Sequence, residues 1–185
     1  MKLFEIIKNR RSIMPNQFND RPIKESELNN ILEAANWAPT HKKTEPWRFK
    51  VFKNNAKQKL GNFLAKKYEN TTENFSKFRH DKIKEKLTKS SVVIAICMQR
   101  DLKESLPEWE ELASVSMAVQ NMWLMASNLG IGSYWSSPSL MNYLGEHISL
   151  LEGEKCLGFF YMGKYSAEIA LRKPGAFEDK IERFY

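Results

Sequence analysis

Glycine and proline are scarce in this chain, with 8 and 7 copies among 185 residues. Low-complexity chains carry roughly 25–30% of these two residues together, so the composition excludes that class. Hydrophobic residues make up 42% of the chain, which is ample for one folded core. The N-terminal segment MKLFEIIKNRR carries a charge every few residues and therefore lacks the apolar core of a secretory signal. We expect one cytoplasmic domain over residues 1–185.

Cysteine and histidine are also rare, with two and three copies. Cys97 and Cys156 each lie inside an apolar run, and no CxxC or His/Cys pair has the spacing of metal ligands. We expect two reduced core cysteines, no disulfide framework and no metal site. The chain also lacks GxGxxG after a strand, GxxxxGKS/T, GxSxG and HExxH. If the chain is an enzyme, we expect a cofactor to do the chemistry, and we assign no catalytic side chain.

Apolar spacing predicts a mixture of helices and strands. The predicted elements are a short helix ending near residues 10–12, a helix around 28–35, a strand at 47–51, helical sequence over 55–89, a strand at 91–98, a long helix between Pro107 and Gly130, a strand at 131–135, a short helix near 139–146, a strand at 156–162 and a basic, irregular tail over 164–185. The run at 91–98 is continuously apolar, which is typical of a strand covered on both faces. Residues 47–51 alternate between apolar and basic, as in a half-buried strand.

Charged residues are missing between Leu112 and Gly145, although the chain as a whole is 28% charged. Serine, glutamine and asparagine interrupt this stretch, so it is not a membrane span of about 20 apolar residues. The long helix carries an apolar stripe at helical spacing, made of Leu112, Val115, Val119, Met122, Ala126 and Leu129. Further apolar side chains lie off the stripe, at Trp109, Met117, Trp123 and Met125. A helix that is apolar on more than one side favours a subunit interface over burial within one subunit.

Lys and Arg outnumber Asp and Glu by 29 to 22, which gives a formal charge of +7. The basic stretches 53–67 and 77–89 raise the alternative of a nucleic-acid-binding protein. Their lysines are interleaved with Asn, Asp and Glu, and no recognised nucleic-acid-binding motif accompanies them, so a solvated helix face is the favoured interpretation.

The aromatic residues within 62–86 make that segment a candidate lid over the site. An ordinary amphipathic helical segment is the alternative.

Arg10, Arg11 and Ser12 end the first predicted helix, so two guanidinium groups and a hydroxyl diverge from one point of the chain. Guanidinium groups make charge-assisted, often bidentate hydrogen bonds to phosphate, which makes a phosphate monoester the natural ligand. The C-terminal end of the helix dipole is negative, so the side chains alone would hold this anion. Cationic capping of the helix is the other interpretation, and the residues by themselves leave it open.

Two loops carry further polar groups. The loop from Ala38 to Trp47 contains two prolines, His41 and two lysines, and it can present donors to a flat ligand, with a solvated surface loop as the alternative. The segment from Gly130 to Pro138 runs from a helix end through a strand into a serine-rich turn. Its glycines are too few for a dinucleotide fingerprint.

Four segments stand in order along the chain: NRRSI at 9–13, ILEAANWAPTHKKTEPWRF at 31–49, LGIGSYWSS at 129–137 and CLGFFYMGKYS at 156–166. Together, over essentially the whole chain, they resemble the nitroreductase family, most of all its small single-domain NAD(P)H nitroreductases. The resemblance implies an α+β fold with a central, mainly antiparallel sheet flanked by helices. It also implies a homodimer with the long central helix at the interface and one FMN per active site, surrounded by residues of both subunits.

The resemblance further implies which residues contact FMN. They are Arg10, Arg11 and Ser12 at the phosphate and ribityl chain, Trp37 and His41 from the partner subunit, Trp135, Ser136 and Ser137 on the other side of the flavin, and Arg172 or Lys173 of the basic tail at the phosphate. Two positions depart from similar small nitroreductases, which often carry Arg at the position of Ser136 and can carry a basic residue at that of Trp37. Both departures remove positive charge near the flavin.

The activity that the resemblance implies is reduction of nitroaromatic, quinone or related acceptors with NADH or NADPH, by a ping-pong hydride transfer through FMN. The two departures leave the preferred nicotinamide and the acceptor open. A family member that uses its flavin for a different reaction is the nearest alternative, since a fold does not fix a function.

Overall fold

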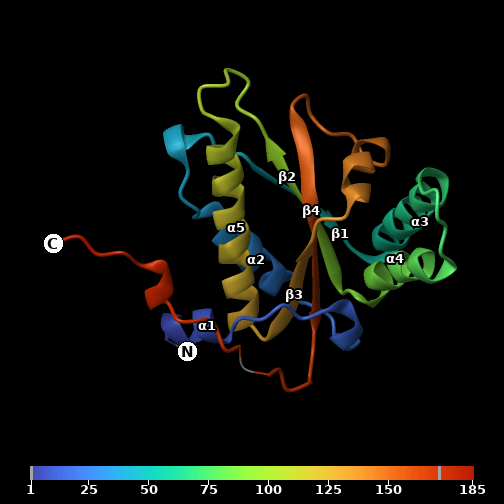
Figure 1. Ribbon diagram of the computed structural model, residues 1–185. Coiled ribbons are helices and arrows are strands. Elements are labelled where there is room, and N and C mark those ends of the chain that lie inside the picture. Colours follow the sequence, from blue (N-terminus) through green and yellow to red (C-terminus); the bar gives the residue numbers. More distant parts are fainter. Residues whose placement is uncertain (1, 171) are drawn as a thin grey trace.

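A four-stranded sheet forms the centre of the computed structural model, which describes residues 2–170 and 172–185 (Figure 1). Its strands are β1 (Trp47–Phe52), β2 (Val92–Gln99), β3 (Ile131–Ser136) and β4 (Glu154–Lys164). They lie in the order β1-β2-β4-β3, and each neighbouring pair is antiparallel. The predicted α+β fold with a mainly antiparallel sheet is confirmed.

Strand β2 lies inside the sheet and is covered on both faces, as its continuous apolar run predicts. Every side chain from Val92 to Met98 is buried. Because successive side chains of a strand point to opposite faces, Ile94 and Ile96 pack into one core cluster while Val93 and Ala95 pack into the other. The edge strand β1 departs from the predicted alternation at its end, where Val51 is exposed and Phe52 is buried.

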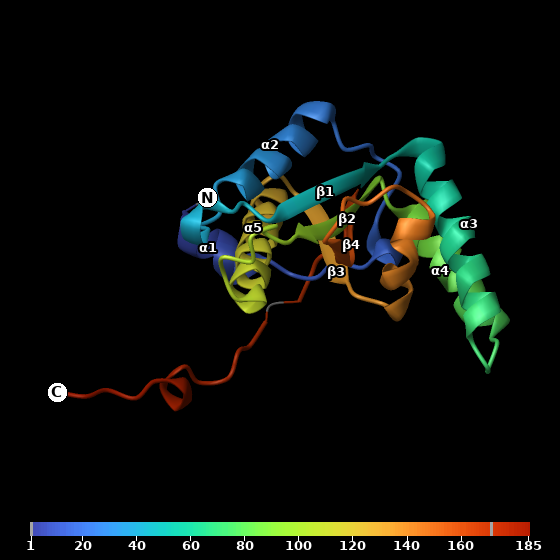
Figure 2. The ribbon, with the colours of Figure 1, turned by 90° about the horizontal axis from the view of Figure 1, so that it is seen from above.

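The helices α1 (Leu3–Asn9), α2 (Glu25–Asn36) and α5 (Glu108–Asn128) lie on one side of the sheet (Figure 2). The apolar faces of α2 and α5 share a core cluster with one face of β2. Helix α1 is different because it buries none of its side chains, and Leu3, Phe4 and Ile7 are exposed. Within residues 2–170 and 172–185, Leu3 and Ile7 of the apolar face of α1 are therefore left uncovered, while Ile6 is half-buried.

The other side of the sheet is covered by α3 (Asn54–Thr71), α4 (Lys77–Lys89) and the 3₁₀ helix η3 (Ser139–Glu146). The sequence predicts helix throughout 55–89, and the structure corrects this with a break at 72–76. The hydroxyl of Tyr68 accepts a hydrogen bond from the Ser76 amide at 3.1 Å, and the Ser76 hydroxyl caps α4. Threonine, asparagine and serine in this break favour such local hydrogen bonds over a continued helix.

The predicted stripe is buried at Val115, Val119, Met122 and Ala126 of α5, whereas Leu129 is half-buried just after the helix and the first position is exposed. Leu112 is 42% exposed, and its neighbour Glu111 is fully buried instead. The Glu111 carboxylate lies 2.6 Å from Nε of Arg100 and also accepts a hydrogen bond from the Asp101 amide at 2.8 Å. This ion pair turns Glu111 inward, so the helix presents Leu112 to its outer surface.

Two features outside the helical layers complete the fold. Cys97 and Cys156 are buried and free, as expected, and they stand opposite one another on β2 and β4. After β4 the chain is mostly irregular apart from the short 3₁₀ helix η4 (Glu178–Lys180), and its end extends away from the body as an arm (Figures 1 and 2).

Within residues 2–170 and 172–185, none of the helices combines the length and apolar character needed to cross a membrane.

Candidate functional site

The segment after α1 is fixed against the middle of β3. Ser12 forms a bridge to Ser133, and the Ile13 amide donates to the Ser133 carbonyl at 3.0 Å. This approach is close because a β-carbon on Gly132 would lie only 2.8 Å from Cγ2 of Ile13. The glycine therefore lets the two backbones meet and holds the preceding arginines at the edge of the sheet.

Arg10 carries a buried donor without a partner. Its guanidinium lies over the ring of Trp123, 4.5 Å from the centroid. Nη1 is buried, and no group in the described part of the chain accepts a hydrogen bond from it. Burial lowers the pKa of Arg10, and the nearby positive charges of Arg11 and Arg172 lower it further. A half-buried guanidinium with one buried, unpartnered donor, next to two other cations, is a site that an anion would stabilise.

Arg11 uses its guanidinium differently. Nη1 donates to the carbonyls of Lys8 and Arg10, each at 2.8 Å, and Nε donates to the Ala170 carbonyl at 3.2 Å. These bonds satisfy carbonyls at the end of α1 and tie that end to the chain beyond β4. Of the two interpretations that the sequence leaves open, Arg11 thus shows helix capping, whereas Nη1 of Arg10 has no acceptor among the described residues.

Trp135, Ser136 and Ser137 occupy the far end of β3 and the turn after it. Nε1 of Trp135 donates to the Leu157 carbonyl at 3.3 Å, Ser136 is half-buried, and Ser137 is exposed. Trp135 fits because Gly158, with φ of +143°, leaves room for it; a β-carbon there would lie 2.4 Å from Nε1. The indole ring is therefore held in one orientation at this end of the strand.

Sequence reasoning did not single out Ser133 or Trp123 as site residues. The Ser133 hydroxyl is buried and has no hydrogen-bond partner within residues 2–170 and 172–185. Nε1 of Trp123 donates to the Arg11 carbonyl at 3.3 Å, so this side chain supports both arginines. The motif LGIGSYWSS contains Ser133, so the sequence indicates its segment but not this residue. For Trp123 the sequence indicates only an apolar residue off the α5 stripe.

The structure separates His41 from the arginines within one chain, whereas Trp37 shares a groove with α1. Trp37 is 79% exposed and lines a groove of about 310 Å³ between α1, α2 and α5. His41 Nδ1 lies 2.5 Å from the Glu110 carboxylate in the first turn of α5. Glu110 and Trp123 are separated by roughly 20 Å along the helix at 1.5 Å per residue. Within one subunit, His41 is therefore remote from Arg10.

The loop that carries His41 has an unusual backbone. Lys42, Lys43 and Glu45 all have positive φ, at 50°, 55° and 42°. Non-glycine residues rarely adopt this left-handed region, and such strain gathers at ligand-binding sites. The strain fits the expectation that this loop faces a ligand.

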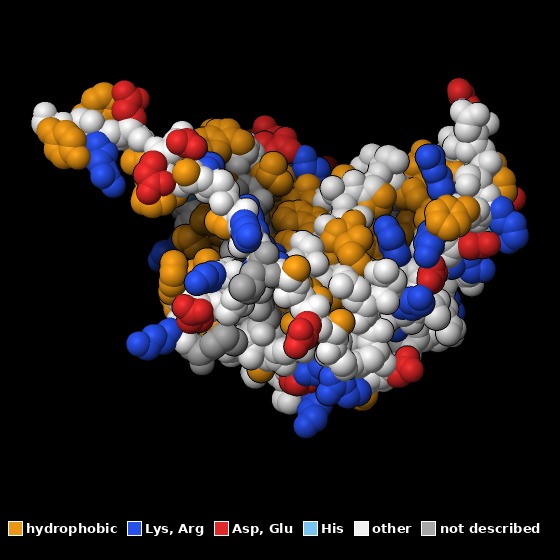
Figure 3. Space-filling model, turned by 60° about the horizontal axis from the view of Figure 1, so that its bottom comes forward, with side chains coloured by type: hydrophobic (Ala, Val, Ile, Leu, Met, Phe, Trp, Pro, Cys, Tyr) orange, Lys and Arg blue, Asp and Glu red, His pale blue; other side chains and the backbone are white. Residues whose placement is uncertain are grey.

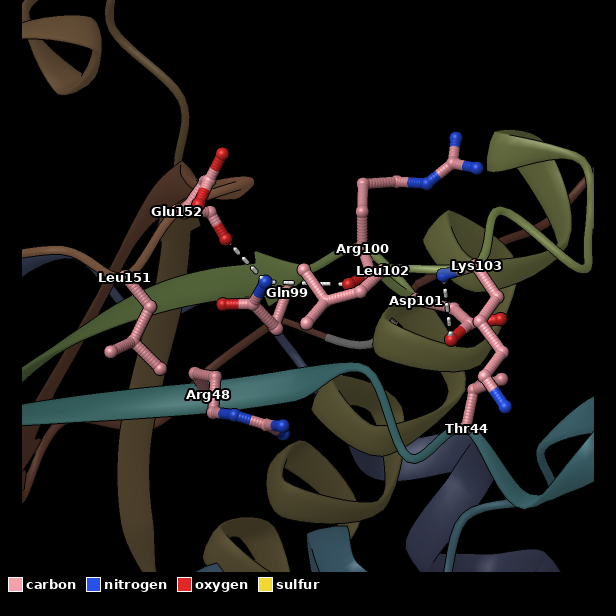
Figure 4. Close-up of a pocket in the computed structure, with 9 residues that line it drawn as sticks. All are labelled: Thr44, Arg48, Gln99, Arg100, Asp101, Leu102, Lys103, Leu151 and Glu152. Carbon is pink, nitrogen blue, oxygen red and sulfur yellow. Dashed lines mark hydrogen bonds between the residues drawn. The ribbon is translucent and has the colours of Figure 1, made fainter.

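A second cavity, of about 630 Å³, lies at the ends of β1 and β2 and is drawn in Figure 4. Its arginines already have partners. Arg48 Nη1 donates to the carbonyls of Glu45 and Trp47, each at 2.8 Å. Arg100 is directed away from Arg48 in Figure 4 and pairs with the buried Glu111. The arginines of this cavity therefore have fewer free hydrogen-bond donors for an anion than the cluster at Arg10 has.

Comparison with known proteins gives one consistent result. The model of the nitroreductase family matches residues 7–164. YfhC of Bacillus subtilis, provisionally named an NAD(P)H nitroreductase, is 30% identical over 140 residues, which are 75% of this chain and 71% of YfhC. A nitroreductase-like family protein from Bacillus cereus has a crystal structure with a TM-score of 0.83 and 25% identity, covering 100% of this chain and 96% of that one. A Bacteroides fragilis nitroreductase with bound FMN shares the fold, with a TM-score of 0.73, 20% identity and 100% coverage of both chains.

Proposed function

Because the chain belongs to the nitroreductase family, we propose that it is an FMN-dependent oxidoreductase. In this proposal NADH or NADPH donates the electrons, and a nitroaromatic, quinone or related compound accepts them. The family membership supports the oxidoreductase class, and the FMN-bound relative supports the cofactor. The observation that carries the proposal is the buried, unpartnered Nη1 of Arg10 among three arginines.

The arginine cluster fits the phosphate of FMN. A phosphate dianion would neutralise the repulsion between Arg10, Arg11 and Arg172 and would accept the hydrogen bond that Nη1 of Arg10 lacks. Ser12 and Ser133 are paired at the backbone bridge to β3, and their hydroxyl groups suit the hydroxylated ribityl chain. These residues can therefore hold the polar end of the cofactor.

The flat ring system would lie toward Trp135, Ser136 and Ser137, with Trp37 and His41 supplied by a second subunit. The exposed apolar side chains of α1 and α5, such as Phe4 and Met117, suit an interface between two copies. A homodimer would also bring the loop of one subunit to the arginines of the other. In this arrangement His41 and Arg10 can contact the same FMN although they are far apart within one chain.

When bound, FMN would supply the redox chemistry that passes electrons from the nicotinamide donor to the acceptor. The protein anchors the phosphate through Arg10, orients the ring through the fixed indole of Trp135, and excludes water from the core side of the site. We assign no side chain to proton transfer. With Ser136 and Trp37 in place of basic residues, the site has less positive charge to select a donor or acceptor.

The basic surface of α3 and α4 does not favour the nucleic-acid-binding alternative. Several of its lysines are engaged in ion pairs within the chain, namely Lys53 with Glu25, Lys67 with Glu146, Lys77 with Asp81, and Lys82 and Lys89 with Glu85. Such pairing is typical of a solvated helix face.

Titration of the FMN-free protein with FMN tests the proposal directly. We predict that Arg10→Met raises the Kd for FMN at least about tenfold, because it removes one charge-assisted hydrogen bond to the phosphate. Lys8→Met is the matched control, since it removes one positive charge from the exposed face of the same helix, and it should change the Kd less than about twofold. Equal FMN affinity of the wild type and Arg10→Met would contradict the assignment.

A further inference from the structure

A hollow of about 410 Å³ lies between α3, α4 and the start of η3. One wall is Pro138 and Ser139, which follow Ser137 directly in the chain. The opposite wall comes from the segment that the sequence marks as a candidate lid, through Tyr68, Thr71, Thr72, Phe78, Arg79, Lys82, Ile83 and Lys86. The hollow therefore begins where the proposed flavin-binding turn ends.

The lining of this hollow is cationic. Among the residues that form it there is no Asp or Glu. Lys82 is paired with Glu85 at 2.7 Å, but Arg79 and Lys86 have no carboxylate within 4.0 Å in the described ranges 2–170 and 172–185. In Figure 3, Lys and Arg side chains on the right of the molecule are interspersed with Asp and Glu side chains and border the hydrophobic side chains of the central depression. Uncompensated cations in a recess attract a phosphorylated ligand.

Aromatic and hydroxyl groups accompany these cations. Phe78 is 70% exposed, and Nζ of Lys82 lies over its ring, 5.6 Å from the centroid, so an exposed aromatic ring accompanies the cations. Tyr68 is held in place because its hydroxyl accepts from the Ser76 amide at 3.1 Å. The hydroxyl of Thr72 lies along the same wall, whereas the Thr71 hydroxyl already donates to the Lys67 carbonyl at 2.7 Å. An aromatic platform beside unpaired cations suits a ligand that combines a planar base with phosphate groups, which is the chemistry of a nucleotide.

We infer that this hollow binds the adenosine and phosphate end of the nicotinamide electron donor. Arg79 and Lys86 contact the phosphates, and Phe78 stacks on the adenine. The inference rests on the proposed function, because the nicotinamide must reach the flavin beside Ser136 and Ser137 while the rest of the dinucleotide lies further along the same surface. The α3–α4 segment is then a recognition element for the donor.

Stopped-flow reduction of the FMN-loaded enzyme tests this inference with two kinds of donor. NADH and NADPH carry the adenosine and phosphates, whereas N-benzyl-dihydronicotinamide delivers a hydride without either. We expect Arg79→Gln and Lys86→Gln each to raise the apparent Kd for NADH and NADPH about tenfold, and to leave reduction by the benzyl compound within about twofold of the wild type. ADP should compete with NADH in the wild type and should lose this competition in the double variant.

The matched control is Lys84→Gln, which removes one positive charge from an exposed position of α4 that does not line the hollow. It should leave the Kd for all three donors within about twofold of the wild type. Unchanged Kd values for NADH and NADPH in Arg79→Gln and Lys86→Gln would overturn the inference, and so would an equal loss with the benzyl donor. Failure of the proposed function has a different signature, because the wild type would then not bind FMN or would not be reduced by any of the donors.

Discussion

Arg10 and Arg11 are adjacent in the sequence, yet their guanidinium groups differ in their hydrogen-bond partners. Arg11 donates to three backbone carbonyls, whereas Arg10 keeps a buried donor without a partner in the described part of the chain. The sequence could predict that two guanidinium groups diverge near one point. It could not predict which one remains open, because that depends on Trp123 and the segment beyond β4, which are distant along the chain.

Gly158 is another residue whose importance depends on a distant neighbour. Its φ of +143° and the nearby Nε1 of Trp135 leave no room for a side chain. We predict that Gly158→Ala lowers the free energy of unfolding by about 2–4 kcal/mol, through backbone strain and displacement of the indole. Gly145→Ala is the control, since its β-carbon would have no neighbour closer than 3.6 Å. Urea denaturation of both variants measures the difference, and equal stability of the two would refute the explanation.

At the scale of elements, most of the fold could be predicted from apolar spacing. The buried strand β2 has a continuous apolar run that admits few other interpretations. The break between α3 and α4 was missed because hydrogen bonds of Tyr68 and Ser76, rather than glycine or proline, create it. Leu112 was misplaced because a fully buried Glu111 paired with Arg100 overrides the apolar stripe. Polar contacts between elements are what spacing alone does not reveal.

The packing of η3 against α3 predicts a pH effect on stability. The His147 ring at the end of η3 stacks on Phe63, with centroids 4.9 Å apart. Burial lowers the pKa of His147 below its usual 6.5, and the charge of Lys59 lowers it further. The unfolded chain therefore binds this proton more readily, so stability is lost as the pH falls through about 6.5 toward the folded pKa.

Thermal unfolding at several pH values checks this effect. We expect the Tm of the wild type to fall between about pH 7.5 and pH 5.5. His147→Phe keeps an aromatic ring at this position and removes the titrating group, so its Tm should fall less over the same range. An identical pH dependence in both proteins would show that other groups are responsible.

At the scale of the whole molecule, exposed apolar side chains on α1 and α5 predict the homodimer. Met117 is exposed on α5 within the long stretch without charge. We predict that Met117→Glu weakens the dimer by at least tenfold in Kd and weakens FMN binding with it, because it places a charge in the interface and removes the second subunit's contribution to the site. Asn62→Glu, on the exposed surface of α3, is the control.

Light scattering measures the dimer prediction directly. The wild type and Asn62→Glu should have twice the 21.6 kDa mass of the chain, and Met117→Glu should shift toward that single mass on dilution. A wild-type particle of 21.6 kDa that still binds FMN at full affinity would contradict a site shared between subunits.

The measurement that tests the central claim most directly is the visible absorption spectrum of the purified protein, with identification of any chromophore released by heat. We predict a flavin spectrum from FMN at about one per subunit, and recovery of that spectrum when FMN is added back to the stripped protein. A colourless protein that fails to bind added FMN would contradict the FMN assignment, because the unpartnered guanidinium of Arg10 would then bind some other anion.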